Sequence, residues 1–306
     1  MRTRFAPSPT GAQHVGNART YLISWLSARS RGGEIALRIE DIDSPRIKPG
    51  AMEQALDDLR WLGLDWDGEP VVQTPRLPLY QLSLDELKSR ELVYPCTCTR
   101  TDIANAASAP HAEHEGPVYP GTYSGRSANE IPDGPFAWRF RVQESPRFTD
   151  EFCGDVAIDL AQVGGDFVVW KNTGTPAYQL AVAVDDAEMG ITHVVRGDDL
   201  LPSTPRQMLI FQALELAPPR YAHVPLVVGE DGRRLAKRHG DTRLSALRAA
   251  GVKPESLVGL LAWSCGWIEK IEPIMAKELL PRFEWERIPR EPFVLTEELL
   301  KRIWYR

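Results

Sequence analysis

The sequence contains few cysteines, four among 306 residues, and this scarcity excludes the disulfide framework of a small secreted domain. It also lacks an apolar run long enough to span a membrane, and no signal-peptide pattern opens it. Positive charge is not in excess either, since the formal net charge is −6, which argues against a generally basic coat for nucleic acid. We therefore expect a globular, cytoplasmic protein that acts as a monomer and has no membrane partner.

The most informative pattern that is present lies at the N-terminus. Residues 3–6 indicate a short buried strand, and the prolines and glycine of residues 7–11 predict a turn. From His14 onward apolar residues recur at helical spacing until Gly32-Gly33. A tight turn into a helix N-terminus is a natural phosphate site, where Gly16 would admit a nucleotide close to the backbone and His14 would offer a ring N–H. The spacing of the glycines does not match the dinucleotide-binding fingerprint.

A second strand, residues 34–40, follows this helix and is apolar on both faces, as in a parallel sheet. Strand, helix and strand in this order begin a doubly wound α/β fold, whose ligands lie at the carboxyl ends of the strands. Glu40 and Asp41 fall at that edge. Taken alone, two acids at a strand end more often belong to a solvated turn or a helix cap.

The remaining chain predicts an insertion between two halves of this sheet. Residues 94–135 are rich in Pro, Gly, Ala, Ser and His and have no persistent periodicity. We expect residues 166–170 to return to the parallel sheet as a strand, and Ser203 to cap the next helix. The expected division is a first catalytic half, an insertion, a second catalytic half and a helical segment, over residues 1–93, 94–165, 166–240 and 241–306. Further expected elements are helices at 50–62, 77–92, 242–250, 254–266, 275–283 and 296–304, and strands at 136–142, 152–158 and 221–228.

One local basic run stands out in this acidic chain. Its members are Arg233, Arg234, Lys237, Arg238, Arg243 and Arg248. Such a run is usually a solvated loop and helix face. It is also the one candidate surface for a polyanionic partner.

Two blocks resemble the signatures of class I aminoacyl-tRNA synthetases. His14-Val15-Gly16-Asn17 resembles the first signature, and residues 234–238, Arg-Leu-Ala-Lys-Arg, resemble the second. The preceding block, residues 4–11, is similar to the glutamate-specific branch. The resemblance implies a Rossmann-type parallel sheet and the use of ATP with Mg²⁺, with His14, Gly16 and Lys237 binding ATP and with His14 and Lys237 catalytic. The lysine would offset charge that develops on the phosphates.

The resemblance also implies a pocket for L-glutamate. Glu40 matches the residue that contacts the α-amino group, and Arg196 matches the arginine that faces the side-chain carboxylate. An arginine can bind a carboxylate with two parallel hydrogen bonds. The full set of implied glutamate-binding residues is Arg4, Phe5, Ala6, Pro7, Ser8, Glu40, Tyr178 and Arg196.

Relatives in this family hold a structural zinc ion in the insertion, and the matching residues here are Cys96, Cys98, Tyr119 and Tyr123. A phenol is a poor zinc ligand at its ordinary pKa, whereas cysteine and histidine are good ones. His111 and His114 are the available substitutes. We predict two structural thiols, with zinc absent or well below one ion per chain.

The resemblance covers only the catalytic part of a glutamyl-tRNA synthetase, and we expect no anticodon-binding domain. A branch with this layout, the glutamyl-queuosine branch, activates glutamate and attaches it to queuosine in the anticodon of tRNA(Asp). We predict that activity, with the anticodon arm as partner. Two alternatives stay open: a compact synthetase that charges a tRNA 3′ end, and a non-catalytic nucleotide- or RNA-binding paralogue, which Ala236 in the second signature motivates.

Overall fold

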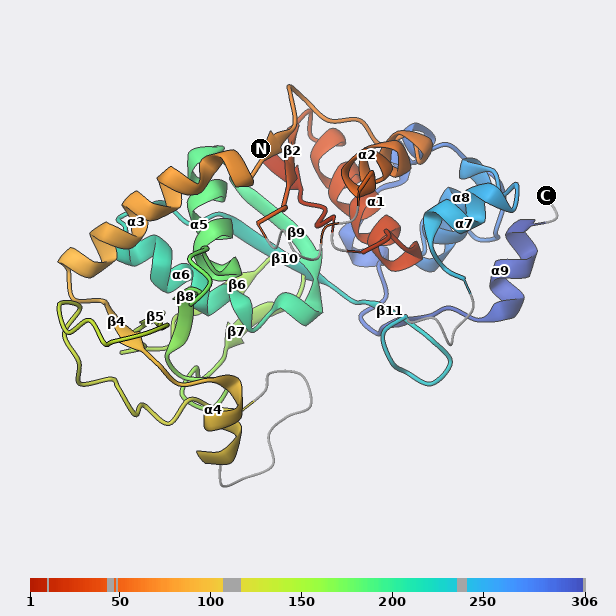
Figure 1. Ribbon diagram of the computed structural model, residues 1–306. Helices are drawn as coiled ribbons and strands as arrows, with labels where there is room; N and C mark the ends of the chain where they lie inside the picture. The colour runs from red at the N-terminus through yellow and green to blue at the C-terminus, as the bar shows by residue number, and fades with distance from the viewer. Residues whose placement is uncertain (10, 43–46, 48, 107–116, 236–240, 305–306) are drawn as a thin grey trace.

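The computed structural model describes residues 1–9, 11–42, 47, 49–106, 117–235 and 241–304 (Figure 1). Lys237, together with Ala236 and Arg238, lies outside these described residues, as do His111 and His114. Within the described part of the chain, no helix has both the length and the apolar character needed to cross a membrane.

Parallel strands form the centre of the catalytic half. β1 pairs with β2, and β2 pairs with β3. β9 pairs with β10 and lies beside the free edge of β1, where the amide of Thr192 donates a hydrogen bond to the carbonyl of Arg2 at 2.9 Å. These two parallel sheets lie side by side in the order β3-β2-β1-β9-β10 and confirm the predicted α/β fold. The strands are β1 (Arg2–Phe5), β2 (Glu34–Ile39), β3 (Val71–Val72), β9 (His193–Gly197) and β10 (Arg220–Val224).

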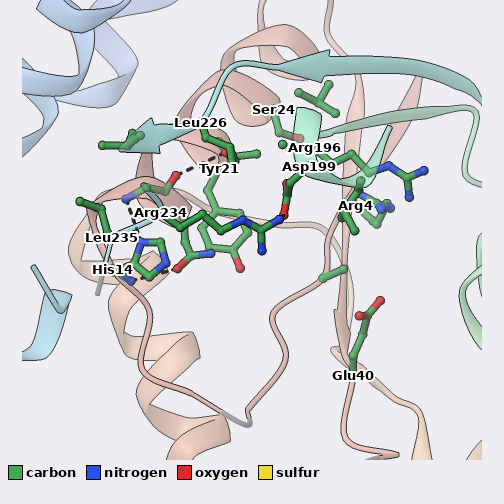
Figure 2. Close-up of a pocket in the computed structure, with 18 of the residues that line it drawn as sticks. Arg4, His14, Tyr21, Ser24, Glu40, Arg196, Asp199, Leu226, Arg234 and Leu235 are labelled. Carbon is green, nitrogen blue, oxygen red and sulfur yellow. Dashed lines mark hydrogen bonds and ion pairs between the residues drawn. The ribbon is translucent and has the colours of Figure 1, made fainter. Parts of the chain in front are cut away.

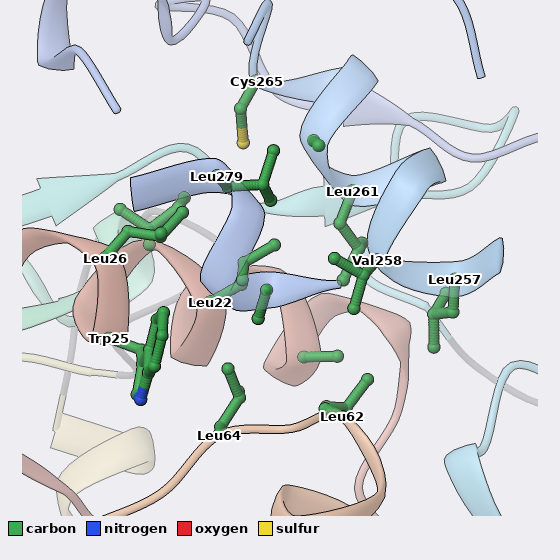
Figure 3. Close-up of a cluster of buried hydrophobic side chains, with 14 of the residues drawn as sticks. Leu22, Trp25, Leu26, Leu62, Leu64, Leu257, Val258, Leu261, Cys265 and Leu279 are labelled. Atoms are coloured by element: carbon green, nitrogen blue, oxygen red, sulfur yellow. The ribbon is translucent and has the colours of Figure 1, made fainter. Parts of the chain in front are cut away.

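The first helix, α1 (Val15–Arg29), lies between this sheet and the C-terminal helices (Figures 1 and 3). Ten of its 15 residues are buried, because it packs against both neighbours. Leu22 and Leu26 meet Leu261 and Leu279 from the C-terminal segment in one hydrophobic core. The other helices around the parallel sheet are α2 (Ala51–Trp61), α3 (Leu77–Ser89), α5 (Tyr178–Glu188) and α6 (Ser203–Ala213), with short 3₁₀ helices at Thr74–Arg76 and Asp198–Leu200.

The insertion has an antiparallel sheet of its own, in the order β4-β5-β8. Our expectation that residues 166–170 rejoin the parallel sheet is wrong, because β8 pairs with β5 and stacks Phe167 on Phe140 at a ring separation of 5.3 Å. An apolar strand does not encode which sheet it will join. This sheet therefore extends beyond the expected bounds of the insertion, residues 94–165, at both ends. Its strands are β4 (Val93–Cys96), β5 (Ala137–Phe140) and β8 (Phe167–Trp170), and the insertion also contains the helix α4 (Arg100–Ala106).

A separate hairpin, β6 (Arg147–Asp150) and β7 (Gly154–Ala157), follows β5. The strand expected at residues 152–158 therefore starts later, because Phe152 lies in the turn and is buried against Trp285. Ser203 also departs from expectation. Pro202 holds the cap position of α6, and the hydroxyl of Ser203 instead accepts a hydrogen bond from Gln179 at 3.0 Å.

The C-terminal segment is mainly helical, as predicted, with two differences. Residues Ala276–Arg282 form a 3₁₀ helix that contains Pro281, a residue that cannot donate the hydrogen bond of a regular α-helix turn. Residues Phe293–Val294 form a short strand, β12, that the sequence did not indicate and that pairs with β11. The elements are β11 (Val227–Val228), α7 (Leu244–Ala249), α8 (Pro254–Ser264), a 3₁₀ turn at Trp285–Arg287, β12 and α9 (Glu297–Trp304).

Gly259, inside α8, allows the backbone of Glu272 to cross the helix closely. A Cβ at residue 259 would lie 1.9 Å from the carbonyl oxygen of Glu272. Alanine normally stabilises a helix relative to glycine by up to about 1 kcal/mol. Here we expect Gly259→Ala to lower the free energy of unfolding by about 1–3 kcal/mol or more, because the overlap is with backbone.

Chemical denaturation measures this effect, with Gly125→Ala as the control. A Cβ at Gly125 meets nothing within 4 Å, so that variant should stay within about 0.5 kcal/mol of the parent protein. A stabilised Gly259→Ala protein would show that the crossing is looser than described.

Candidate active site

A cavity of about 540 Å³ opens at the carboxyl ends of β1, β2 and β9 (Figure 2). It brings together seven residues that the sequence singled out from positions far apart in the chain. These are Arg4, Ala6, His14, Gly16, Glu40, Tyr178 and Arg196. The location is the one that a doubly wound sheet provides for its ligands.

The other predicted glutamate-binding residues support the cavity from nearby. The side chain of Phe5 is fully buried and packs edge-on against Tyr21 at 5.4 Å. The carbonyl of Pro7 accepts a hydrogen bond from the amide of Glu40 at 3.1 Å and so ties the ends of β1 and β2 together. Ser8 lines a smaller adjoining cavity of about 160 Å³, together with Glu40 and Tyr178.

His14 is the cap residue of α1. Its ring Nδ1 accepts a hydrogen bond from the amide of Gly16 at 3.1 Å, and its own amide donates to Oδ1 of Asn17 at 3.0 Å. Burial lowers the pKa of His14, which favours the neutral ring. Since Nδ1 accepts, the proton of the neutral ring is on Nε2, and this N–H remains a donor.

Gly16 keeps the His14 ring in place by having no side chain. A Cβ at residue 16 would lie 2.9 Å from Cε1 of His14, closer than real Cβ contacts. The glycine therefore allows the imidazole to fold back over the first turn of α1. The ring lines the cavity at the N-terminal end of α1, where the helix dipole favours an anion.

The floor of the cavity rests on buried ion pairs that the sequence did not reveal. Arg38 bonds to Asp186 at 2.6 Å and to Glu40 at 3.0 Å, and Arg4 lies 3.4 Å from Asp186. Burial alone would raise the pKa of Asp186, but the guanidinium groups of Arg38 and Arg4 bring the net shift below its ordinary value. Two features of the sequence could have pointed to these ion pairs. Arg38 is an arginine in the largely apolar strand β2, and Asp185 and Asp186 are adjacent acids in the largely apolar helix α5.

Arg196 has a defined orientation at the end of β9. Its Nε donates to Nε2 of His223 at 2.9 Å, and its Nη2 donates to the hydroxyl of Thr204 at 2.8 Å. Its Nη1 is buried and has no hydrogen-bond partner among the described residues. A buried guanidinium nitrogen without a partner is costly, so a ligand acceptor in the cavity would stabilise it.

Much of the basic run is neutralised where the structure describes it. Arg234 forms an ion pair with Asp199 at the edge of the cavity, and Arg243 forms one with Asp241. Arg248 pairs with Asp58 at 3.1 Å. For this part of the basic run, the contacts agree with the interpretation that it is an ordinary solvated loop and helix face. Lys237 and Arg238 lie outside the described residues.

The residues that the resemblance matched to zinc ligands lie together, with Cys96 and Tyr119 buried and Cys98 and Tyr123 partly buried against them. The thiol of Cys96 donates to the hydroxyl of Tyr119 at 3.4 Å and accepts from Nε of Arg139 at 3.3 Å. The Arg139 guanidinium also lies 4.0 Å from the centre of the Tyr119 ring. Burial raises the pKa of Cys98, so this thiol is protonated when no metal is bound.

This donor set does not fit a zinc ion, because a positively charged side chain occupies the space beside the thiol. Among the described residues there is also no group of three or more His, Cys, Asp or Glu side chains placed to hold a metal.

Comparison with known proteins decides the family. Residues 1–301 match the family described as tRNA synthetases class I (E and Q), catalytic domain. The chain belongs to this family. It is 51% identical to the glutamyl-Q tRNA(Asp) synthetase of Rhodopirellula baltica, over 96% of each chain. It is 40% identical to the glutamate–tRNA ligase of Aquifex aeolicus, over 98% of this chain and 65% of the ligase.

The class I synthetase fold is confirmed by a solved structure. The glutamate–tRNA ligase of Elizabethkingia meningosepticum, determined in complex with its amino acid, superposes with a TM-score of 0.83 at 27% identity. The match covers 99% of this chain and 68% of the ligase.

Zinc content tests the interpretation of the Cys96 cluster. We expect elemental analysis of protein purified without chelators to find well under one zinc ion per chain, because Arg139 and the Tyr119 phenol already contact the Cys96 thiol. Dialysis of the protein against zinc, followed by gel filtration, checks that purification did not simply remove a bound zinc ion. One tightly held ion per chain would refute the prediction and make His111 and His114 the first residues to test.

Proposed function

We propose that this chain activates L-glutamate with ATP and transfers it to queuosine in the anticodon of tRNA(Asp). The observation that carries the amino-acid part is one cavity holding Arg4, Arg196 and Glu40. Two guanidinium groups and one carboxylate complement a ligand that has two carboxylates and one ammonium group. The similarity to glutamyl-Q tRNA(Asp) synthetases over nearly their whole length supports the acceptor.

In the first step an oxygen of the glutamate α-carboxylate attacks the α-phosphorus of ATP, and pyrophosphate leaves. Arg196 binds the side-chain carboxylate, and Glu40 receives the α-ammonium group. His14 donates from Nε2 to a phosphate oxygen at the N-terminus of α1, and Lys237 holds the phosphates and offsets their developing charge. Bound Mg²⁺ supplies further neutralisation of the phosphates.

In the second step a nucleophile on the acceptor nucleoside attacks the acyl carbon of the adenylate, and AMP leaves. A second cavity, of about 490 Å³, lies against the insertion and is lined by Arg100, Tyr119 and Arg139, with Gln179 from α5. Gln179 follows Tyr178 of the first cavity directly, so adjacent residues of α5 line both cavities. This second cavity supports the entry of a nucleoside from the side of the insertion.

The position of the attached glutamate tests the acceptor. Radiolabelled glutamate is incubated with ATP, the protein and tRNA from cells with and without queuosine, and nuclease fragments are identified by mass. We expect the label on the anticodon fragment of tRNA(Asp), only in queuosine-containing tRNA. A label on the 3′-terminal adenosine would identify a compact glutamyl-tRNA synthetase. An absence of glutamate-dependent pyrophosphate exchange would indicate a non-catalytic paralogue.

The role of Arg196 is tested by Arg196→Ala in ATP–pyrophosphate exchange without tRNA. Loss of a buried charged hydrogen bond costs roughly 2–5 kcal/mol, so we expect kcat/KM for glutamate to fall about 30-fold or more. Arg60→Ala is the control, because Arg60 is exposed and its ion pair with Asp57 lies on the surface of α2. Unchanged glutamate kinetics in Arg196→Ala would remove this residue from the pocket.

A further inference from the structure

A buried chain of hydrogen bonds runs from the end of β6 to Arg196. Nε of Arg196 bonds to Nε2 of His223 at 2.9 Å, and Nδ1 of His223 bonds to Oδ2 of Asp150 at 2.6 Å. These three side chains are at most 4% exposed. They come from β9, β10 and β6, so the parallel sheet and the hairpin meet in this chain.

The direction of these hydrogen bonds is fixed by chemistry. A guanidinium has only donors, so Nε2 of His223 must accept from Arg196 with its lone pair. The ring proton is then on Nδ1 and is donated to Asp150. Burial lowers the pKa of His223 to about 4, so the ring is neutral at pH 7 and keeps this lone pair.

Asp150 is itself held in one orientation. Its Oδ1 accepts from the backbone amides of Phe152 at 2.9 Å, Cys153 at 2.8 Å and His223 at 3.1 Å. Only Oδ2 remains for the His223 ring. Burial opposes the charge of Asp150, but the bonds from His223 and the backbone bring the net pKa shift below the ordinary value, so the carboxylate is ionised.

Tyr221 and Thr204 complete the surroundings of the His223 ring and of Arg196. Tyr221 stacks on His223 at a ring separation of 6.0 Å and faces the Arg196 guanidinium at 5.1 Å. The hydroxyl of Thr204 bonds to Nη2 of Arg196 and lies 3.1 Å from Nε2 of His223. The positive charge of Arg4, on β1, further lowers the pKa of His223.

We propose that Asp150 and His223 are positioning residues for Arg196. Through the tautomer of the His223 ring they hold Arg196 in the orientation that binds a ligand carboxylate, and so they set the preference of the pocket for a carboxylate over an amide. The proposal deepens the proposed function and rests on its glutamate pocket. Held by Nε and Nη2, Arg196 keeps the buried and unpartnered Nη1 for the ligand. An arginine free to rotate would lose this selectivity, since planar donors recognise carboxylates only when they are aligned.

Asp150→Asn tests the proposal with almost no change in shape. The three backbone amides bound by Oδ1 require the amide oxygen at that position, which turns the NH₂ group toward Nδ1 of His223. Nδ1 must then accept, and the ring proton moves to Nε2, where it opposes the N–H of Arg196. We expect the KM for glutamate in tRNA-free exchange to rise about tenfold or more, with a smaller change in kcat and a reduced preference over glutamine.

Two further variants separate positioning from folding. Asp155→Asn makes the same chemical change on β7 of the hairpin, where the carboxylate accepts an exposed bond from Thr149, and should leave KM unchanged. His223→Gln offers a side-chain oxygen to Arg196 without a ring tautomer. Adding Asp150→Asn to His223→Gln should therefore raise KM much less than it does in the parent protein.

The ring tautomer is read directly from the ¹⁵N chemical shifts of His223. We expect the proton on Nδ1 in the parent protein and on Nε2 in Asp150→Asn. A parent ring protonated on Nε2, or an unchanged glutamate KM in Asp150→Asn, would overturn the proposal. If Asp150→Asn does not fold, two other measurements decide the proposal. One is the tautomer of the His223 ring in the parent protein, and the other is the KM for glutamate of His223→Leu, which removes the acceptor for Arg196.

These outcomes are distinct from failure of the proposed function. Glutamate activation followed by labelling of a 3′ end would refute the queuosine acceptor and leave the positioning result intact. If the parent protein shows no exchange, calorimetry of glutamate binding to the parent and to Asp150→Asn replaces KM. Equal affinity of the two proteins would then overturn the positioning role.

Discussion

The catalytic half depends on keeping charges paired where β1, β2 and α5 meet. Arg38 is fully buried, and its guanidinium bonds to Asp186 and Glu40. Asp186 also lies within ion-pair distance of Arg4. Removing one member of such a set leaves a buried charge unpaired, which costs roughly 3–5 kcal/mol. The two strands and the helix are therefore fixed together, and the cavity at their ends takes its shape from this constraint.

Asp185, the neighbour of Asp186 on α5, extends the constraint toward the insertion. Its carboxylate accepts hydrogen bonds from the hydroxyl of Tyr80, from Gln73 at 2.7 Å and from Arg76 at 2.7 Å. These residues belong to α3 and the turn before it, and α3 leads directly into β4 of the insertion. Two consecutive acids thus connect the floor of the first cavity to the helix that leads into the insertion.

The pocket separates groups that hold the structure from groups that face the ligand. Arg38 donates its hydrogen bonds to protein carboxylates and is not among the residues lining the cavity. Arg196 instead donates to the neutral side chains of His223 and Thr204, and its Nη1 is left for a ligand. Neutral partners matter because a protein carboxylate bound to Arg196 would compete with the ligand carboxylate for the same charge. A histidine and a threonine orient the guanidinium without neutralising it.

The sequence by itself determined the strand, turn and helix at the N-terminus, because proline, glycine and helical spacing act over a few residues. It also indicated Arg4, His14, Glu40 and Arg196, which stand in recognisable blocks. Only the tertiary structure decided that Arg38 pairs with Asp186, 148 residues away, and that Asp150 fixes His223, 73 residues away. It likewise placed β8 in the sheet of the insertion. Pairings over such distances depend on which surfaces meet when the chain packs, and no local pattern of residue types specifies them.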